Sequence, residues 1–423
     1  MTSAPGSPSL VEHTFRHEYG RIVSSLARRY GFHRIELIED AVQTAMLAAL
    51  RSWANTGPPD NPAAWLIRAA HHRLLDDLRS ANRSRVDFLS SDDEATASDD
   101  NLPPPDSGYF EHEIADDELR MLFVCADESL PTESRIVLAL KVLSGFGTRE
   151  IALRLFTSED NVQKRLGRAR ERLRELEASF DSPSPDVLRA RLSAVHQIVY
   201  LIFNEGYCST QPDRLIRREL CDEAIRLGNL LAAHPEARSP EGDALLALMY
   251  LHASRFDARV DGHGGLLLLE DQDRSLWDHE KIQLGLRYLT RSAEGDVFSR
   301  YHAEAAVAVE HALAPSFAAT RWNEIVQLYS MLEKIAPSPL HTLNRAIALA
   351  EWKGPDVALS LLRELKPPAW LLGYYLWDAT LGELERRAGN LERARAHLER
   401  ALAAAPHPAE RALLERRLRA CSE

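Results

Sequence analysis

Apolar residues recur along most of the chain at spacings of three and four, whereas the apolar and polar alternation of a β-strand is nearly absent. A spacing of three and four lines one face of an α-helix with apolar side chains. Stretches rich in Pro, Ser and Gly divide this pattern into three blocks, at residues 10–86, 112–178 and 185–423. The sequence therefore predicts an all-α protein in three parts.

The first block contains two predicted helices. "IELIEDAVQTAMLAALRSW" (residues 35–53) is amphipathic with an acidic beginning, and "AAWLIRAAHHRLLDDLRSANRSR" (residues 63–85) follows the break "NTGPPDNP". In that break, Asn61 and Pro62 predict an N-cap and a first-turn proline. The second helix is expected to bury four side chains and to carry basic residues at its other positions. The four expected to be buried are Trp65, Leu66, Ala69 and Leu78.

The second block predicts a pair of helices joined by a tight turn. "GFGTREIALRLF" (residues 145–156) forms a short helix with Thr148 as its cap, and Ser158 caps the helix that follows. At 100° per residue, four apolar side chains of this second helix share an arc of about 60°, and five polar or basic ones occupy another arc of about 100°. The apolar four are Val162, Leu166, Ala169 and Leu173, and the other five are Asn161, Lys164, Arg165, Arg168 and Arg172.

This pair of helices predicts a helix-turn-helix unit, whose second helix enters the major groove of DNA. Lys and Arg can contact phosphates or guanine edges there, and Asn161 can pair with adenine. The alternative is an amphipathic helix whose basic face is merely solvated. The short preceding helix, the capped turn and the separated arcs favour DNA binding.

The net charge of −12 at first argues against a nucleic-acid partner. However, the segment from Asp87 to Glu118 holds twelve Asp or Glu and no Lys or Arg, which equals the whole excess. This Ser- and Pro-containing segment has few large apolar residues, so residues 87–111 are predicted to be a flexible linker. We hypothesise that its charge keeps the flanking basic regions off nonspecific DNA, and neutralising its acids tests that idea.

The third block predicts a helical-repeat domain. "YYLWDATLGELERRAGNLERARAHLERALAAAP" (residues 374–406) matches small, apolar and turn positions of a 34-residue tetratricopeptide unit. A weaker partner lies at residues 339–368. Such units are helical hairpins that bury their faces by stacking, so a solenoid or a compact helical array is expected.

Other classes of protein fit less well. The four cysteines lack metal-type spacing, so no metal, cofactor or disulfide framework is predicted. No apolar stretch approaches the roughly 20 residues of a membrane span, and the start lacks the features of a secretory signal. A cytoplasmic protein is therefore expected, without membrane contact.

An enzyme is not expected, because no phosphate-binding glycine loop or nucleophile elbow is present. Two groups of carboxylates remain as remote hydrolase candidates. In "NEGY", Glu205 stands beside Gly206, which is interpreted as a helix breaker. In "LLEDQDRSLWD" (residues 268–278), several acids lie near Arg274 without the regular oxygen spacing of a calcium loop. The interpretation preferred there is a loop with internal ion pairs that leads into a helix.

The helix-turn-helix segment "GTREIALRLFTSEDNVQKRLGRAR" resembles the C-terminal DNA-binding region of bacterial sigma factors of the extracytoplasmic-function subfamily. "IEDAVQTAMLAALRSW" and "NPAAWLIRAAHHRLLDDLRS" are similar to that family's clamp-binding and promoter-melting helices. The extension, with "YLIFNEGY" and "LCDEAIRLG", is similar to the subgroup that carries a C-terminal helical-repeat domain. Phe156 replaces the Gly common in the family's turn.

The resemblance implies two small helical sigma domains joined by the acidic linker, plus a regulatory extension. Residues 10–86 would be the region 2 domain, residues 112–178 the region 4 helix-turn-helix domain and residues 185–423 the extension. It implies polymerase contacts at Glu39, Asp40 and Gln43. The side chains implied to contact the −10 element are Arg68, His71, His72, Arg73 and Arg79, and those for the −35 element are Asn161, Lys164, Arg165 and Arg168.

The expected function is that of a transcription initiation factor, with core RNA polymerase and promoter DNA as partners. The extension is expected to control it, by contact with the sigma domains, with polymerase or with another partner. His72 stands where the family usually has Asn, which makes base reading there uncertain. The alternative is a one-component DNA-binding regulator whose helical-repeat domain senses a ligand and which never contacts polymerase.

Overall fold

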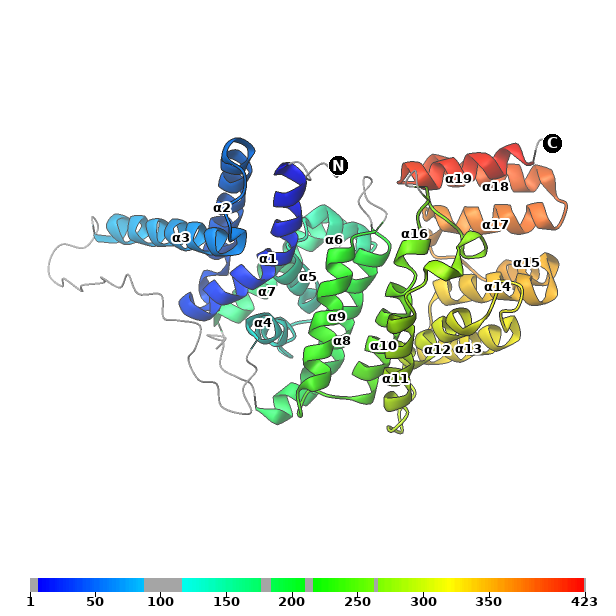
Figure 1. The fold of residues 1–423 in the computed structure, drawn as a ribbon, viewed down its shortest axis with the longest axis horizontal. Helices are drawn as coiled ribbons and strands as arrows, with labels where there is room; N and C mark the ends of the chain where they lie inside the picture. Colours follow the sequence, from blue (N-terminus) through cyan, green and yellow to red (C-terminus); the bar gives the residue numbers. More distant parts are fainter. Residues whose placement is uncertain (1–6, 87–115, 176–183, 210–215, 262–264, 422–423) are drawn as a thin grey trace. The chain divides into compact units, whose positions relative to one another are not determined.

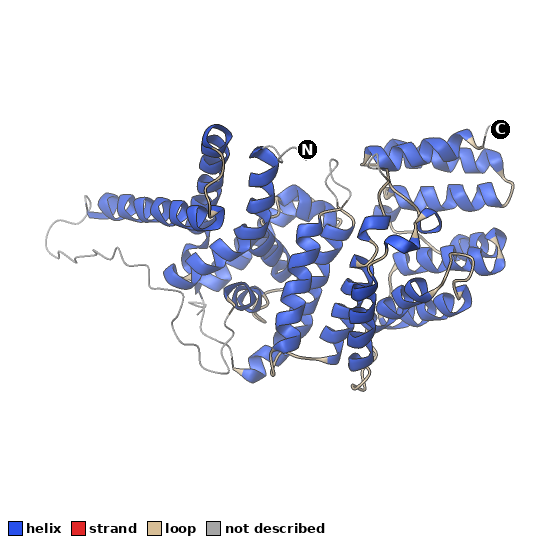
Figure 2. Cartoon of the chain, viewed as in Figure 1, coloured by secondary structure: helices blue, strands red, loops and turns tan. Residues whose placement is uncertain are grey.

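The computed structural model describes residues 7–86, 116–175, 184–209, 216–261 and 265–421. All regular elements within these ranges are helices, apart from one isolated bridge between Val260 and Leu266. The prediction of an all-α protein is therefore confirmed (Figures 1 and 2). The predicted acidic linker, residues 87–111, lies outside the described residues.

The chain forms two compact units, residues 1–198 and 199–423. Unit 1 therefore contains both of the first two predicted blocks. Its helices are α1 (Ser7–Tyr30), η1 (Phe32–Arg34), α2 (Ile35–Thr56), α3 (Pro62–Val86), α4 (Asp117–Cys125), α5 (Thr132–Ser144), α6 (Thr148–Arg154) and α7 (Glu159–Glu175). The boundary between the units falls within α8 (Pro185–Tyr207).

Helix α3 begins as predicted. The Asn61 side chain accepts a hydrogen bond from the Ala64 amide at 3.0 Å, and Pro62 is the first helical residue. Its buried face differs from the prediction, because Leu66, Ala70 and Leu74 are fully buried whereas the other expected side chains are half-buried. The half-buried set is Trp65, Ala69 and Leu78. The buried face of α3 therefore follows Leu66, Ala70 and Leu74, which are spaced four residues apart. This row lies beside the one that the sequence predicted.

Unit 2 consists of helices that pack on their neighbours in the chain. These are α9 (Arg218–Ala233), α10 (Pro240–Ala253), η2 (Phe256–Ala258), η3 (Leu269–Asp271), η4 (Arg274–Leu276), α11 (His279–Ser292), α12 (Arg300–Leu313), α13 (Trp322–Ile335), α14 (Pro339–Lys353), α15 (Pro355–Glu364), α16 (Ala369–Leu372), α17 (Tyr375–Arg387), α18 (Leu391–Ala404) and α19 (Pro408–Arg419). Figure 1 shows the last of these as successive helices in orange and red.

The predicted repeat at residues 374–406 corresponds to the hairpin of α17 and α18. Gly389 turns the chain with a φ of 82°, a conformation that favours glycine. Gly382 lets the helices approach closely, since a Cβ there would lie 2.8 Å from the Leu398 side chain. The weaker partner at residues 339–368 contains the consecutive helices α14 and α15. Helical hairpins are present at both positions, and their assignment to the tetratricopeptide class stays a prediction.

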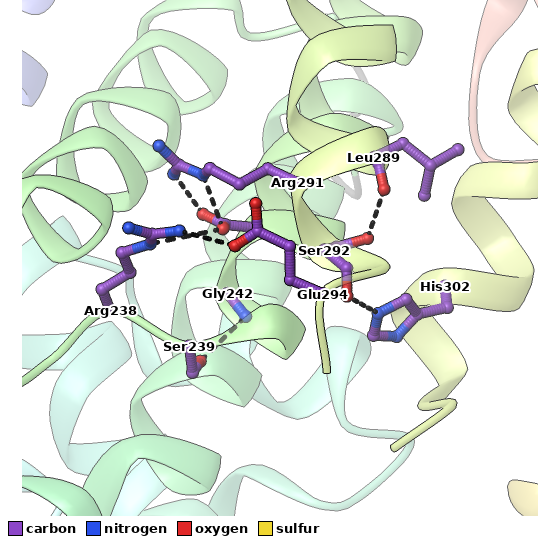
Figure 3. A network of polar contacts seen from close by, with 9 residues as sticks. Arg238, Ser239, Gly242, Leu289, Arg291, Ser292, Glu294 and His302 are labelled. Carbon is purple, nitrogen blue, oxygen red and sulfur yellow. Dashed lines mark hydrogen bonds and ion pairs between the residues drawn. The ribbon is translucent and has the colours of Figure 1, made fainter. Parts of the chain in front are cut away.

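A buried carboxylate joins helices α10 and α11. Asp243 is 2% exposed and receives two hydrogen bonds from Arg291, one of them at 2.7 Å from Nε, and Arg238 lies 3.8 Å away. Figure 3 shows this network with the Ser239 cap of α10 and with His302 of α12, which contacts the last turn of α11. The buried Asp243 carboxylate favours this packing of α10 against α11, because any other packing that separates it from its arginines leaves a buried charge without a partner.

Candidate nucleic-acid interface

The helix-turn-helix geometry follows from α6, a tight turn and α7. Ser158 caps α7, with its hydroxyl accepting from the Asn161 amide at 3.3 Å. Thr148 does not cap α6 as expected, since the helix begins at Thr148 and the Glu150 side chain instead accepts from the Gly147 amide at 2.7 Å. In the turn, Phe156 has a φ of 50° and is half exposed.

Helix α7 has the two faces that its sequence predicts. Val162, Leu166, Ala169 and Leu173 are all buried, which confirms the expected apolar face. On the other face, Lys164 and Arg168 are exposed, and Asn161 and Arg165 are half-buried. We call Asn161, Lys164, Arg165 and Arg168 the α7 ridge.

The basic residues of α7 differ in their partners. Arg170, Arg172 and Arg174 each form an ion pair with a glutamate. Within the described ranges, no ion pair is recorded for Lys164, Arg165 or Arg168. The Asn161 amide nitrogen donates to the Thr157 hydroxyl at 2.9 Å, which fixes its orientation. The unpaired cations thus lie together on the ridge, where an external phosphate can neutralise them.

The predicted −10 residues on α3 do not share one environment. Arg68, His72, Arg73 and Arg79 are exposed, with Arg73 paired to Asp77 at 2.9 Å. His71 is 6% exposed, and its Nε2 lies 2.5 Å from the Tyr30 hydroxyl. Burial, with Arg29 and His72 adding to it, lowers the pKa of His71. His71 is therefore a neutral, inward-facing residue here, whereas the other four are accessible.

The three predicted polymerase residues on α2 also separate. Asp40 and Gln43 are exposed, whereas Glu39 is 2% exposed and lies on the inner side of the helix. Glu39 accepts from the Tyr19 hydroxyl at 3.2 Å and forms an ion pair with Arg170 of α7. Burial raises the pKa of Glu39, and Arg170 opposes that effect. A solvent-facing contact surface on α2 therefore includes Asp40 and Gln43 but not Glu39 in this conformation.

Leu47 of α2 is 55% exposed and was not among the residues predicted to contact polymerase. At 100° per residue it lies about 20° from Asp40 and about 40° from Gln43 around the helix axis. A helical wheel of α2 contains this signal, because an apolar side chain stands within an otherwise polar arc. We call Asp40, Gln43 and Leu47 the α2 outer face.

Within unit 1, the first block packs against the second. Helix α1 contacts α4 and α5, and Gly20 of α1 approaches so closely that a Cβ there would lie 2.2 Å from the Leu143 carbonyl oxygen. Arg170 also pairs with Glu36 at 3.1 Å, and Arg28 with Asp117 at 3.1 Å. The role of Arg170 as a link between the blocks could not be predicted from local patterns, because its partners are more than 130 residues away.

The two blocks match two parts of one known family. Residues 15–84 match "Sigma-70 region 2", and residues 120–173 match "Sigma-70, region 4". The chain therefore contains sigma-70 regions 2 and 4, in that order. The outer face of α2 and the basic α3 lie in region 2, and the α7 ridge lies in region 4. A third match, at residues 191–293, is to a family of unknown function, DUF6596.

The chain is similar to two curated relatives. It is 37% identical over 392 residues to "Uncharacterized protein R00370" of Rhizobium meliloti (strain 1021), covering 92% of this chain and 90% of that protein. It is 28% identical over 144 residues to "ECF RNA polymerase sigma factor SigE" of Mycolicibacterium smegmatis (strain ATCC 700084 / mc(2)155), covering 34% of this chain and 53% of that protein. No solved structure matches the chain.

The extension contains a cavity of about 590 Å³, which lies within the size range of small-molecule sites. Its walls are mainly apolar, with Leu268, Ile347, Leu376 and Leu413 among them. The arginines that line it are already engaged by glutamates, as Arg386 is by Glu383 at 2.8 Å. Among the described residues, no helix combines the length and apolarity that crossing a membrane requires.

The carboxylates considered for catalysis have structural partners. Glu205 is fully buried, accepts from the Ser209 hydroxyl at 3.1 Å and lies 3.4 Å from Arg217. Gly206 does not end α8, which continues to Tyr207. Instead it allows a close approach, since a Cβ there would lie 2.7 Å from the Arg217 carbonyl oxygen.

Proposed function

We propose that this chain is a sigma factor of the extracytoplasmic-function subfamily, which binds core RNA polymerase through region 2 and reads its promoter with both regions. The α7 ridge carries this proposal, because its cations form no ion pair within the described part of the chain while the opposite face of the same helix is buried in region 4. Exposed Arg68, His72 and Arg73 on α3 support contact with the −10 element. A factor that acts with polymerase on chromosomal DNA works in the cytoplasm.

In this proposal the α2 outer face binds polymerase. Asp40 and Gln43 supply polar contacts. The exposed Leu47 between them supplies apolar surface that becomes buried on binding. Glu39 has a different part, since it is buried against Arg170. Catalysis of RNA synthesis remains with the polymerase, and the sigma factor contributes binding and promoter opening.

A reconstituted transcription reaction tests the main proposal. Purified core enzyme, the full chain and a promoter template are combined, and RNA synthesis is measured with and without the chain. Promoter-specific RNA that depends on the chain supports sigma activity. Specific DNA binding in the absence of polymerase, with no stimulation of RNA synthesis, contradicts it and supports a one-component regulator instead. The cavity in the extension is the observation that favours this second candidate, since it offers a ligand site.

We further propose that the extension, a helical-repeat domain after residue 185, controls the sigma regions by contact with them or with polymerase. The start of α8 is already held by unit 1, because Arg191 donates to the Phe123 carbonyl oxygen at 2.9 Å and pairs with Asp127. A truncation after residue 180 therefore removes a part of unit 1, whereas one after Ile198 keeps it.

Comparing the two truncations separates control from folding. If the extension restrains the sigma regions, the chain ending at Ile198 transcribes more than the full chain; if it is required, that chain transcribes less. Circular dichroism of both truncations checks that unit 1 remains helical. Equal transcription by the full chain and by a folded 1–198 chain would contradict any control by the extension.

A further inference from the structure

Unit 2 contains a group of cationic and donor side chains that the proposed function does not use. It lies around Trp277, which stands between η4 and α11, and its other members come from α10, from α12 and from the 3₁₀ turns between α10 and α11. The acids of residues 268–278 are not its partners. Asp273 caps η4 through the Ser275 amide at 2.9 Å, and Asp278 caps α11 through the Lys281 amide at 3.0 Å.

Two guanidiniums contact the Trp277 indole. The Cζ atom of Arg274 lies 4.4 Å from the ring centroid, and that of Arg255 lies 5.4 Å from it. Trp277 itself is only 3% exposed. Cation–π contacts of this kind hold two positive charges beside one buried ring.

No carboxylate among the described residues pairs with either guanidinium. Arg274 donates to the carbonyl oxygens of His311 and Ala314 at 2.7 and 2.8 Å, and Arg255 donates to Gln272 Oε1 at 3.2 Å. All these acceptors are uncharged. The expected internal ion pair of Arg274 with the neighbouring acids is therefore absent from the described residues, and the positive charge remains.

A second pair adjoins the first. The Cζ atom of Arg259 lies 3.8 Å from the centroid of the Tyr207 ring, which in turn lies 4.7 Å from the ring of His252. Arg259 donates to the Tyr207 carbonyl oxygen at 2.6 Å, again an uncharged acceptor. In the part of the chain that the structure describes, no ion pair is recorded for Arg255, Arg259 or Arg274.

Four buried nitrogen atoms of this group make no hydrogen bond to any residue that the structure describes. They are Arg274 Nη2, Trp277 Nε1, His252 Nδ1 and His311 Nδ1. Burial, together with the nearby arginines, lowers the pKa of both His252 and His311 to about 3, which places them in the same electropositive surroundings. Arg274 Nη2 and Trp277 Nε1 can only donate, whereas Nδ1 of a neutral histidine donates in one of its two tautomers. Buried donors are nearly always satisfied in proteins, so the unsatisfied Arg274 and Trp277 donors indicate a missing acceptor.

We propose that the cluster of Arg255, Arg274, Trp277, His252 and His311 in unit 2 binds a small oxyanion, such as a phosphate or carboxylate group. An oxyanion accepts several hydrogen bonds at once and neutralises the guanidiniums, which a water molecule does not do. Ligand binding here would stabilise the junction of α10, α11 and α12. The site is thus a place where the extension senses an anionic small molecule, and this inference does not depend on sigma activity.

The test is isothermal titration calorimetry of the full chain with inorganic phosphate, sulfate and acetate at constant ionic strength. All measurements use an Arg165→Ala/Arg168→Ala background, so that phosphate binding at the α7 ridge does not contribute. We expect one saturable site per chain for at least one of the three anions. The order of the three affinities tells a tetrahedral oxyanion from a carboxylate.

Two variants locate the site. Arg255→Gln should weaken binding at least tenfold, because a charge-assisted bond is lost. Trp277→Phe should weaken it several-fold, because the ring stays and the Nε1 donor goes. Arg287→Gln is the matched control, an exposed arginine of α11 with no recorded ion pair among the described residues, and it should change affinity less than twofold.

Circular dichroism checks that each variant is folded. If the Arg255→Gln chain is not folded, the binding result for Trp277→Phe alone decides the test. The absence of saturable binding for all three anions overturns the proposal. Equal weakening by Arg255→Gln and Arg287→Gln, or unchanged binding in a folded Trp277→Phe chain, overturns it as well.

Discussion

The arginines of α7 are close in sequence but differ in what they contact. Arg170 is largely buried against the first block, with ion pairs to Glu36 and Glu39, whereas Arg168 is exposed with no ion pair recorded among the described residues. Arg165 is half-buried beside the apolar face of α7, so its side chain has less conformational freedom than a fully exposed one. A side chain that is held before binding loses less entropy when it contacts a base, which favours Arg165 for sequence reading.

Changing Arg165 to Ala should therefore cost about 1 to 3 kcal/mol in promoter binding and should relax sequence preference at one base pair. Binding is measured by fluorescence anisotropy of holoenzyme on the promoter and on single-base variants. Gln163→Ala, at an exposed position of the same helix, is the control and should have little effect. If Arg165→Ala weakens all sequences equally, the residue contacts phosphate rather than a base.

Phe156 has a positive φ of 50°, a conformation that costs a residue with a Cβ about 1 to 2 kcal/mol. We expect Phe156→Gly to be more stable than Phe156→Ala by about 1 kcal/mol, the reverse of their usual order, because glycine adopts this φ without strain. Urea unfolding of both variants measures the difference, and comparing them with each other removes the effect of the lost ring. Greater stability of the alanine variant would mean that the turn is not strained.

Helix α2 has one face buried in unit 1 and one face exposed to solvent. Glu39 and the buried Ile38 and Val42 face inward, whereas the α2 outer face of Asp40, Gln43 and Leu47 is accessible. An exposed leucine among polar residues on a helix is common in itself. Its position between two residues implied to contact polymerase gives it a role in the proposed function.

Leu47→Glu should weaken binding to core polymerase at least tenfold, because it places a charge in the apolar centre of the proposed interface. Affinity is measured with labelled chain and purified core enzyme. Leu276→Glu, an exposed leucine of unit 2 with 52% exposure, is the matched control for the change in charge. Unfolding curves of both variants should coincide with the wild type, since neither leucine is in a core. Unchanged polymerase affinity in Leu47→Glu would exclude this face.

In the whole molecule, unit 1 holds regions 2 and 4 together, the two regions proposed to read the promoter. The −10 and −35 positions are 25 base pairs apart, or roughly 85 Å of B-DNA at 3.4 Å per base pair. Helix α7, with 17 residues, is only about 26 Å long, and its Arg170 lies directly against α2. With α7 packed directly on α2, regions 2 and 4 lie too close together to reach the −10 and −35 elements at once. We therefore expect the contact between α2 and α7 to open when polymerase binds.

Arg170→Ala should favour the open form, because it leaves the buried Glu39 carboxylate without its ion pair. Electron-spin distance measurements between labels at residues 48 and 163, in a Cys208→Ser background, should show a longer and broader distribution. Affinity for core polymerase should rise as the closed form is depleted. Arg172→Ala, which removes an ion pair within α7 to Glu175, is the control. An unchanged distance distribution in Arg170→Ala would show that this pair does not hold the closed form.

The local features of this protein follow from its sequence alone. The spacing of Val162, Leu166, Ala169 and Leu173 predicted the buried face of α7, and Ser158 and Asn61 predicted helix starts. These succeed because helix periodicity and capping depend on residues only a few positions apart. The family motifs also lie within continuous segments, so region 2 and region 4 could be identified without any contact between them.

Which polar side chains face inward, and which residues they contact there, depends on how the helices pack. Glu39, His71 and Arg170 carry polar groups on helix surfaces, yet each is drawn into a contact with a residue distant in the chain. Arg274 likewise lies beside Trp277 and His311 rather than beside the acids next to it in sequence. Such pairings follow from how helices pack, since a polar side chain that is buried must find a partner wherever the fold supplies one.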